Sequence, residues 1–141
     1  MKFFTNNSLE SEKIGEKIAA NLTGNEIIAL HGDLGVGKTT LIRGIARYCH
    51  TSEDISSPTY NIMHEYDGEK FKIYHFDMYR IGSYEDLEST GFFDYIDTGV
   101  ILIEWSENIE EFLPENTMKI TIKKTNLENQ RIITIEEANI K

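Results

Sequence analysis

The residues from Gly32 to Thr39 combine glycine, lysine and threonine at a spacing that can hold phosphate groups. They match the pattern G-x-x-x-x-G-K-[ST]. Its glycines let the backbone turn tightly and bring N–H groups, with the N-terminus of a following helix, close to an anion. In this pattern Lys38 reaches the outer phosphates and the Thr39 hydroxyl binds Mg²⁺. The residues expected to form this nucleotide site are Gly32, Asp33, Leu34, Gly35, Val36, Gly37, Lys38 and Thr39, with Thr40 extending it.

Two carboxylates end apolar segments and could face the same nucleotide. Asp77 follows the apolar and aromatic residues 71–76, and Glu104 lies near the end of the apolar segment 99–105. A phosphate-loop protein needs an acidic group to hold Mg²⁺ or its water molecules, and we assign this role to Asp77. Glu104 could orient an attacking water molecule or a magnesium-bound water. Acids at strand ends are also common as turn or exposed residues, and the phosphate loop upstream favours the catalytic interpretation.

Three side chains beside these acids have more than one interpretation. His75 fits a packed or hydrogen-bonded strand residue better than a metal ligand, because no cluster of His and Cys at ligand spacing accompanies it. Trp105 fits core or interface packing better than an adenine platform. Arg80 could pair with a phosphate or with a nearby acid such as Glu85, and the sequence leaves both open.

Segment 56–59, Ser-Ser-Pro-Thr, lies between the helix expected after the phosphate loop and the next strand. A loop that responds to the outer phosphate could occupy this place, with the Thr59 hydroxyl directed to Mg²⁺. The same residues are also common in ordinary turns. We hypothesise that Mg-ATP orders residues 57–59 and so favours docking on a partner.

An α/β framework must position these groups. Apolar runs typical of buried strands alternate with helical patterns, which predicts a mixed sheet flanked by helices, as in other P-loop proteins. Ser8 is a plausible N-cap of the first helix, and Asp67-Gly68 is a hairpin signal. We expect helices at residues 8–22, 39–49, 83–90, 93–96 and 106–112, and strands at residues 26–31, 60–66, 71–76, 99–105, 119–123 and 131–136, the last two as a closing hairpin or a pair of edge strands.

The composition predicts one compact domain over residues 1–141, since domains most often hold roughly 100–150 residues. Cys49 is the single cysteine, which excludes an intramolecular disulfide and suggests a reducing compartment. No segment approaches the ~20 apolar residues of a membrane span. The net charge of −10 disfavours direct binding to nucleic acid. We therefore expect a cytoplasmic protein without membrane or DNA contact, to which a partner would bring any RNA.

Four motifs in this order carry a resemblance to one family: G-D-L-G-V-G-K-T-T, S-P-T, H-F-D-M-Y-R and E-W-S-E. They resemble the TsaE (YjeE) family of bacterial ATPases in tRNA threonylcarbamoyladenosine (t6A) biosynthesis. The resemblance implies a small cytoplasmic P-loop ATPase that uses ATP and Mg²⁺ and acts with the TsaB and TsaD proteins. That machinery modifies position 37 of tRNAs that read ANN codons. Carbamoyl transfer belongs to TsaD, and the ATPase, weak alone and more active in the complex, is thought to reset the pair between turnovers.

The resemblance also implies roles for individual residues. Lys38 and Thr39 would bind phosphate and Mg²⁺, and the two acids at positions 77 and 104 would face the metal. Thr59 would belong to a switch loop. The residues implied to lie near the nucleotide are Ser8 and Leu9, in the stretch 8–10 near the adenine. The position of Arg131 near the C-terminal strands suggests that it approaches the nucleotide as well. Ser106 stands where many members carry proline, and we expect little consequence from this difference.

Two other classes of protein compete with a hydrolase accessory. A small P-loop kinase needs arginines to clamp a second phosphate-bearing substrate and a lid to exclude water, and this chain has only four arginines. A non-hydrolysing ATP-dependent switch would use the same binding residues. A GTPase is disfavoured because no guanine-reading N-K-x-D element follows the phosphate loop. Exposed aromatic residues are candidates for the partner surface, namely Tyr84, Phe92, Phe93 and Tyr95.

Overall fold

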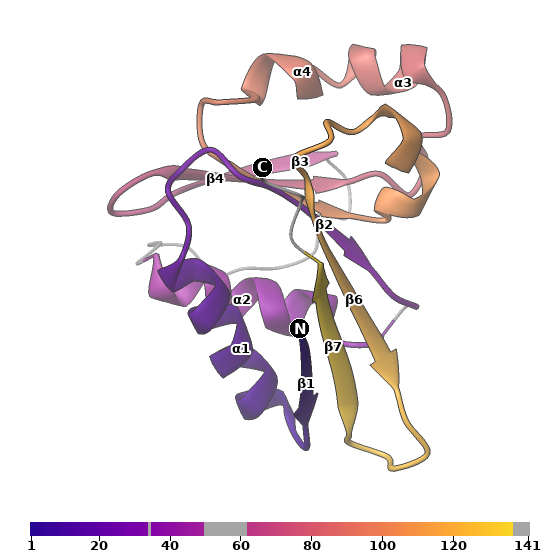
Figure 1. Ribbon diagram of the computed structural model, residues 1–141. Helices are drawn as coiled ribbons and strands as arrows, with labels where there is room; N and C mark the ends of the chain where they lie inside the picture. Colours follow the sequence, from indigo (N-terminus) through magenta and orange to yellow (C-terminus); the bar gives the residue numbers. More distant parts are fainter. Residues whose placement is uncertain (34, 50–61, 137–141) are drawn as a thin grey trace.

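The strands of the chain join one mixed sheet in the computed structural model, which describes residues 1–33, 35–49 and 62–136 (Figure 1). The strands are β1 (Lys2–Thr5), β2 (Ile27–His31), β3 (Met63–Asp67), β4 (Lys72–Asp77), β5 (Val100–Glu104), β6 (Met118–Lys124) and β7 (Arg131–Glu136). The helices are α1 (Ser8–Ala20), α2 (Lys38–Tyr48), α3 (Tyr84–Ser89) and α4 (Phe92–Tyr95), followed by the 3-10 helices η1 (Ser106–Asn108) and η2 (Glu110–Phe112). The predicted α/β class is confirmed, and the prediction of one domain over residues 1–141 stays a prediction.

The sheet has the order β1-β7-β6-β2-β5-β4-β3. Its four central strands, β6, β2, β5 and β4, run parallel, while β1, β7 and β3 pair antiparallel with their neighbours. The predicted hairpin of the last two strands is confirmed as β6–β7. The alternative of two edge strands is wrong. Strand β6 lies between β7 and the central β2, and β1 pairs with the other side of β7. Strand β1 was not predicted from the sequence.

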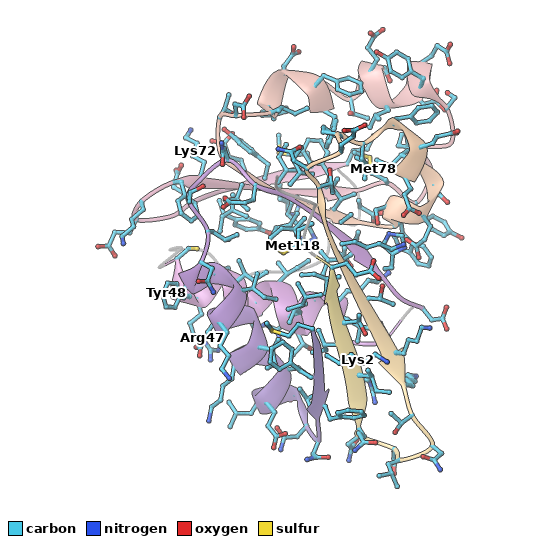
Figure 2. The ribbon with its side chains drawn as sticks, in the orientation of Figure 1. Lys2, Arg47, Tyr48, Lys72, Met78 and Met118 are labelled. Carbon is cyan, nitrogen blue, oxygen red and sulfur yellow. The ribbon has the colours of Figure 1, made fainter. Side chains whose placement is uncertain are left out.

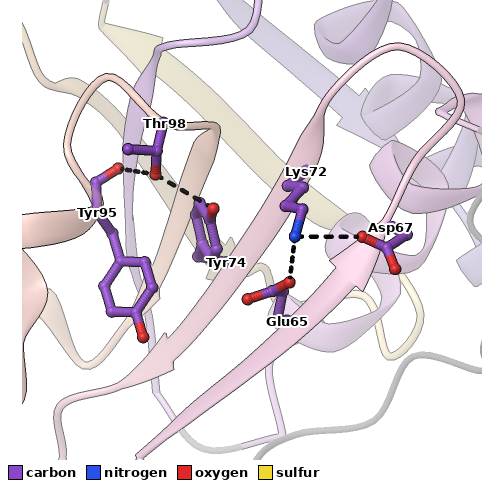
Figure 3. Close-up of polar contacts among 6 residues, drawn as sticks. All are labelled: Glu65, Asp67, Lys72, Tyr74, Tyr95 and Thr98. Carbon is purple, nitrogen blue, oxygen red and sulfur yellow. Dashed lines mark hydrogen bonds and ion pairs between the residues drawn. The ribbon is translucent and has the colours of Figure 1, made fainter.

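Helices cover both faces of the sheet, which explains why every residue of the central strands β2 and β5 is buried (Figure 1). Along β5, Val100 and Leu102 point to the face covered by α1 and α2, and Ile101 and Ile103 point to the face that carries α3 and α4. On the face that carries α3 and α4, the Thr98 hydroxyl donates to the hydroxyl oxygen of Tyr74 in β4 at 3.1 Å (Figure 3). This hydrogen bond ties the loop before β5 to the sheet.

The α1–α2 contact is close because glycines lie at the crossing. A Cβ atom at Gly15 would collide with the Leu41 carbonyl oxygen, and one at Gly44 would collide with the Glu12 carbonyl oxygen. Arg47 lies near the end of α2, at the edge of the same contact (Figure 2). Its guanidinium pairs with the Glu12 carboxylate of α1 at 3.2 Å. This contact fixes the N-terminus of α1 relative to the loop before α2.

Several element ends differ from the expected ones. The N-cap of α1 is Asn7, whose Oδ1 accepts from the Glu10 N–H at 2.9 Å, and the predicted N-cap Ser8 is the first helical residue. The helix expected over 106–112 is two short 3-10 helices that follow Trp105, which takes a left-handed conformation with φ of 60°. Among the described residues no helix has the length and apolar character needed to cross a bilayer.

Candidate nucleotide-binding site

The predicted phosphate loop joins the end of β2 to the start of α2. Gly32 has φ of 150°, and a Cβ there would lie 2.7 Å from Val36 Cγ1 and 2.8 Å from the Ile122 carbonyl oxygen, so only glycine fits. Gly35 and Gly37 also have positive φ, and no atom lies within 4 Å of a Cβ built on either. The loop therefore presents an open glycine backbone directly before the N-terminus of α2, an arrangement suited to an anion.

Lys38 lies folded over this loop. Its Nζ donates to the Gly32 carbonyl oxygen at 2.8 Å and lies 4.0 Å from the centroid of the Trp105 ring. The lysine is only 5% exposed. Trp105 in turn packs edge-on against Tyr79 at 5.0 Å, which agrees with the packing role predicted for it. A cation is thus held at the loop by a carbonyl dipole and an aromatic face.

The register of three neighbouring parallel strands brings the loop and both acids to one edge of the sheet. Leu30, two residues before the phosphate loop, lies opposite Glu104, and Glu104 lies opposite Asp77. The Ser106 hydroxyl fixes this edge further by donating to the Leu30 carbonyl oxygen at 3.1 Å. Ligands of open α/β sheets bind at the carboxyl ends of parallel strands, and this edge is such a place.

The two acids differ in their surroundings. Asp77 is partly exposed, and its Oδ1 accepts from the Tyr79 N–H at 2.9 Å. Glu104 is only 4% exposed, and its Oε2 lies 2.7 Å from Nε2 of the fully buried His75. The prediction that His75 is a hydrogen-bonded strand residue is therefore confirmed. Sequence reasoning missed that its partner is Glu104, because two strands carry the pair.

A pocket of about 400 Å³ lies beside the phosphate loop, between it, the N-terminus of α1 and the β6–β7 turn. Predicted residues at its wall are Ser8, Gly35, Val36, Gly37, Thr40 and Arg131. Leu9, also predicted, is 55% exposed and is not one of the lining residues. Asn7, Ser11 and Asn129 also line the pocket but were not predicted from the sequence. The polar cap of α1 was the available signal for the first two, whereas no local pattern identified Asn129.

Arg131 braces the phosphate loop from the far side of the pocket. Its Nε donates to the Val36 carbonyl oxygen at 2.9 Å. Its Nη1 donates to the carbonyl oxygens of Glu128 at 3.0 Å and Gln130 at 2.9 Å. The guanidinium therefore links the loop to the β6–β7 turn through backbone carbonyls.

The remaining predictions concern Arg80, the aromatic candidates for a partner surface, and positions outside the described residues. Arg80 is exposed and forms no ion pair with Glu85, both of which the structure describes. Tyr84 is exposed and contacts the rings of Phe93 and Phe112, while Phe92 is fully buried, which makes its proposed place on a partner surface wrong. Leu34 and the segment 56–59 with Thr59 lie outside the described residues.

The residues at this edge fit Mg-ATP by their chemistry. Mg²⁺ takes oxygen ligands, keeps several water molecules and is commonly held by one or two carboxylates plus substrate phosphates. The Thr39 hydroxyl and the carboxylates of Asp77 and Glu104 are donors of this kind. Within the described ranges no group of three or more His, Cys, Asp and Glu could hold a metal ion by itself.

His31, at the end of β2 directly before the phosphate loop, has a lowered pKa. Burial lowers its pKa from 6.5, nearby Lys119 and Lys38 lower it further, and Glu107 and Glu110 oppose them. Its Nε2 is buried without a hydrogen-bond partner. A neutral imidazole at the end of β2 adds no charge to the loop that follows.

The fold and the loop together define a class: α/β proteins in which a Walker A loop joins a central parallel strand to a helix. Within that class the chain belongs to the TsaE family, whose model, described as "Threonylcarbamoyl adenosine biosynthesis protein TsaE", matches residues 5–133. The resemblance carried by the four sequence motifs is confirmed.

Individual relatives agree with this family. A protein of Rickettsia prowazekii named tRNA threonylcarbamoyladenosine biosynthesis protein TsaE is 38% identical over 135 residues, covering 95% of this chain and 93% of the relative. A Bacillus subtilis protein of the same name is 36% identical over 135 residues, covering 95% and 84%. The crystal structure of Bacillus subtilis YdiB superposes with a TM-score of 0.78 at 33% identity, covering 99% of this chain and 86% of that one.

Proposed function

We propose that this chain is a Mg²⁺-dependent ATPase that serves t6A formation at position 37 of tRNAs reading ANN codons, together with the TsaB and TsaD proteins. Membership of the TsaE family supports the t6A role. The observation that carries the ATPase role is the strand register, which lines up the phosphate loop, Glu104 and Asp77 at one edge. We propose that the chain acts in the cytoplasm and contacts tRNA only through its partners.

The proposed nucleotide contacts follow the loop and the pocket beside it. The residues 32–39 and Thr40 would hold the phosphates, with Lys38 moving from the Gly32 carbonyl oxygen to the outer phosphates. Ser8 and Arg131 border the pocket, where the rest of the nucleotide would lie. Leu9 remains part of the proposed stretch near the adenine, although it lies outside the pocket wall. Thr59 remains the proposed switch residue.

The proposed chemistry divides between the two acids. The partly exposed Asp77 would hold Mg²⁺ or its waters together with Thr39. The buried Glu104 would orient a water molecule, because its carboxylate is held by a hydrogen bond and its position opposite Asp77 places it beside the metal donors. Mg²⁺ supplies neutralisation of phosphate charge when bound.

The test is phosphate release by the purified chain, alone and with TsaB and TsaD. We expect slow release alone, stimulation by the pair, and loss of both in Asp77→Ala. Asp67→Ala is the matched control, because Asp67 is exposed and pairs with Lys72 at the start of β4, the opposite end of the strand from Asp77 (Figure 3). Weak release that the pair does not stimulate would contradict the proposal.

Glu104→Gln separates the proposed ATPase from the two alternatives. Unchanged affinity for a fluorescent ATP analogue with lost turnover supports hydrolysis through Glu104. Stimulation of the partners by Glu104→Gln as strong as by the wild type would favour a non-hydrolysing switch. Transfer of phosphate to a small acceptor would favour a kinase.

A further inference from the structure

The contact between His75 and Glu104 links a residue of unassigned role to the proposed site. The two side chains come from neighbouring strands and meet diagonally, since Leu102 lies opposite His75 and Asp77 lies opposite Glu104. His75 Nε2 and Glu104 Oε2 are 2.7 Å apart, with the side chains 0% and 5% exposed. A hydrogen bond this short between buried groups restricts both side chains.

The unpaired nitrogen of the ring indicates which way this hydrogen bond runs. His75 Nδ1 is buried and has no hydrogen-bond partner. A neutral imidazole has one N–H donor and one acceptor nitrogen. With the hydrogen on Nε2, the ring donates to Glu104 and leaves only a lone pair unpaired. With the hydrogen on Nδ1, a buried N–H would lack an acceptor, and two lone pairs would face each other across 2.7 Å.

The ring itself cannot swing away from this position. His75 is fully buried in the middle of β4, between β3 and β5, and its ring lies 6.5 Å from that of the buried Tyr66. A donor on a rigid strand therefore holds Oε2, which sets the orientation of the whole Glu104 carboxylate. A carboxylate that orients a water molecule must have such a fixed direction, because small displacements of catalytic groups reduce rates strongly.

We propose that His75 is a positioning residue, which holds the Glu104 carboxylate in the orientation needed for hydrolysis by donating a hydrogen bond from Nε2 to Oε2. This proposal rests on the proposed function, because it requires that Glu104 acts on the hydrolytic water. His75 itself touches neither nucleotide nor metal in this scheme. Its effect therefore belongs to kcat, and ATP affinity does not depend on it.

The kinetic test compares two replacements of His75 with the same replacements of His64. His64 lies directly opposite His75 across β3–β4 but is only partly buried, and its ring contacts the Tyr66 hydroxyl at 3.2 Å. His75→Leu removes the donor, and we expect kcat with the partners to fall about 100-fold while the Kd of a fluorescent ATP analogue stays within about twofold. The amide nitrogen of His75→Gln can donate from nearly the position of Nε2, so this variant should recover most of the rate. His64→Leu and His64→Gln should match the wild type.

A double-variant cycle shows whether His75 acts through Glu104. In the Glu104→Ala background the His75→Leu replacement should lower the residual rate no further, because the group that His75 positions is gone. Equal fold-losses in both backgrounds would overturn the proposal. So would equal rates for His75→Gln and His75→Leu, or a loss that lies wholly in nucleotide affinity.

A measurement without nucleotide keeps the proposal falsifiable if His75→Leu does not fold. Nitrogen NMR of the ¹⁵N-histidine-labelled full chain should show His75 with its hydrogen on Nε2, and Glu104→Ala should shift that signal while Asp67→Ala should not. A hydrogen on Nδ1 would overturn the proposal. Absence of any wild-type turnover with the partners would overturn the ATPase function and this role together. Normal wild-type turnover with an unaffected His75→Leu would overturn this role alone.

Discussion

At the scale of single residues, two cations beside the phosphate loop donate hydrogen bonds to backbone carbonyl oxygens. Lys38 donates to the Gly32 carbonyl oxygen, and Arg131 donates to three backbone carbonyls around the loop. These two cations have different tasks. The lysine has one replaceable contact beside the open glycine backbone, whereas the arginine uses the planar geometry of its guanidinium to hold the loop in shape.

Arg131→Lys tests that distinction. Lysine keeps the positive charge but cannot reproduce the hydrogen bonds from both Nε and Nη1. The link between the Val36 carbonyl and the β6–β7 turn is therefore weakened. We expect the affinity for a fluorescent ATP analogue to fall about 10-fold, which corresponds to about 1.4 kcal/mol. Arg47→Lys is the matched control, because lysine can keep its ion pair with Glu12. Wild-type affinity in Arg131→Lys, with loss only in Arg131→Gln, would show that charge alone matters.

Because His31 is buried, the free energy of unfolding of the chain should depend on pH. Burial lowers its pKa below the ordinary value of 6.5, so the folded state keeps the ring neutral while the unfolded chain takes up a proton first. The stability that this provides is complete above pH 6.5 and is lost as the pH falls from 6.5 through the folded pKa. The slope for one such group is at most about 1.4 kcal/mol per pH unit.

Urea unfolding between pH 7.5 and 5.5 measures this effect. His31→Gln removes the titrating ring, so its unfolding free energy should fall less on acidification than that of the wild type. Identical slopes for His31→Gln and the wild type would contradict the assignment.

The sequence predicted the individual site residues unevenly. The phosphate loop was predictable because its chemistry requires a fixed local spacing, and Asp77 and Glu104 were predictable because they end apolar strands. The His75–Glu104 contact and the hydrogen bond from Arg131 to Val36 were not, because they join residues 29 and 95 positions apart. Only strand register and packing bring such pairs together, and neither leaves a local pattern.

At the scale of elements, the α1–α2 crossing controls the shape of the pocket. α1 carries Ser8 and Ser11 at one wall, and α2 begins at the phosphate loop. Gly15 and Gly44 let the two backbones approach so closely that neither position has room for a methyl group. The crossing therefore couples the packing of two helices to the distance between the two walls of the pocket.

Gly44→Ala should separate these helices. The added methyl group meets the Glu12 backbone, which cannot move aside as a side chain could, so we expect a loss of about 1–3 kcal/mol in the free energy of unfolding. Nucleotide affinity should fall as the wall that carries Ser8 shifts. Gly82→Ala is the control, because its Cβ would meet no atom within 4 Å. Equal melting temperatures of the two variants would contradict a close crossing.

Most elements were predictable from hydrophobic period and turn residues, and the exceptions have physical causes. The four-residue β1 is a strand because β7 offers an edge, so its own sequence carries little signal. The helix expected at residues 106–112 is two short 3-10 helices, and tertiary contacts fix that segment, with the Asn108 side chain donating to the carbonyl oxygens of Met78 and Tyr79. A propensity-based prediction cannot include such contacts.

At the scale of the whole molecule, the negative charge is concentrated in one layer. Residues 81–118 hold ten Asp and Glu and no Lys, Arg or His, so this segment accounts for the net charge of −10. It forms α3, α4 and the 3-10 helices on the face of the sheet away from α1 and α2, together with the buried strand β5 (Figure 1). Like charges at this density repel one another and oppose folding at low salt.

The stability of the chain should therefore rise with salt, and the rise should depend on this layer. Screening becomes effective over distances of about 10 Å near 0.1 M salt, so added NaCl should raise the melting temperature. Glu88→Lys with Glu111→Lys, two exposed positions of the layer, should raise the melting temperature at low salt by roughly 2–8 °C and reduce its salt dependence. The same charge change at Glu16 and Glu136, outside the layer, should leave the salt dependence close to that of the wild type. Equal effects of both double variants would mean that total charge, rather than its concentration on one face, governs stability.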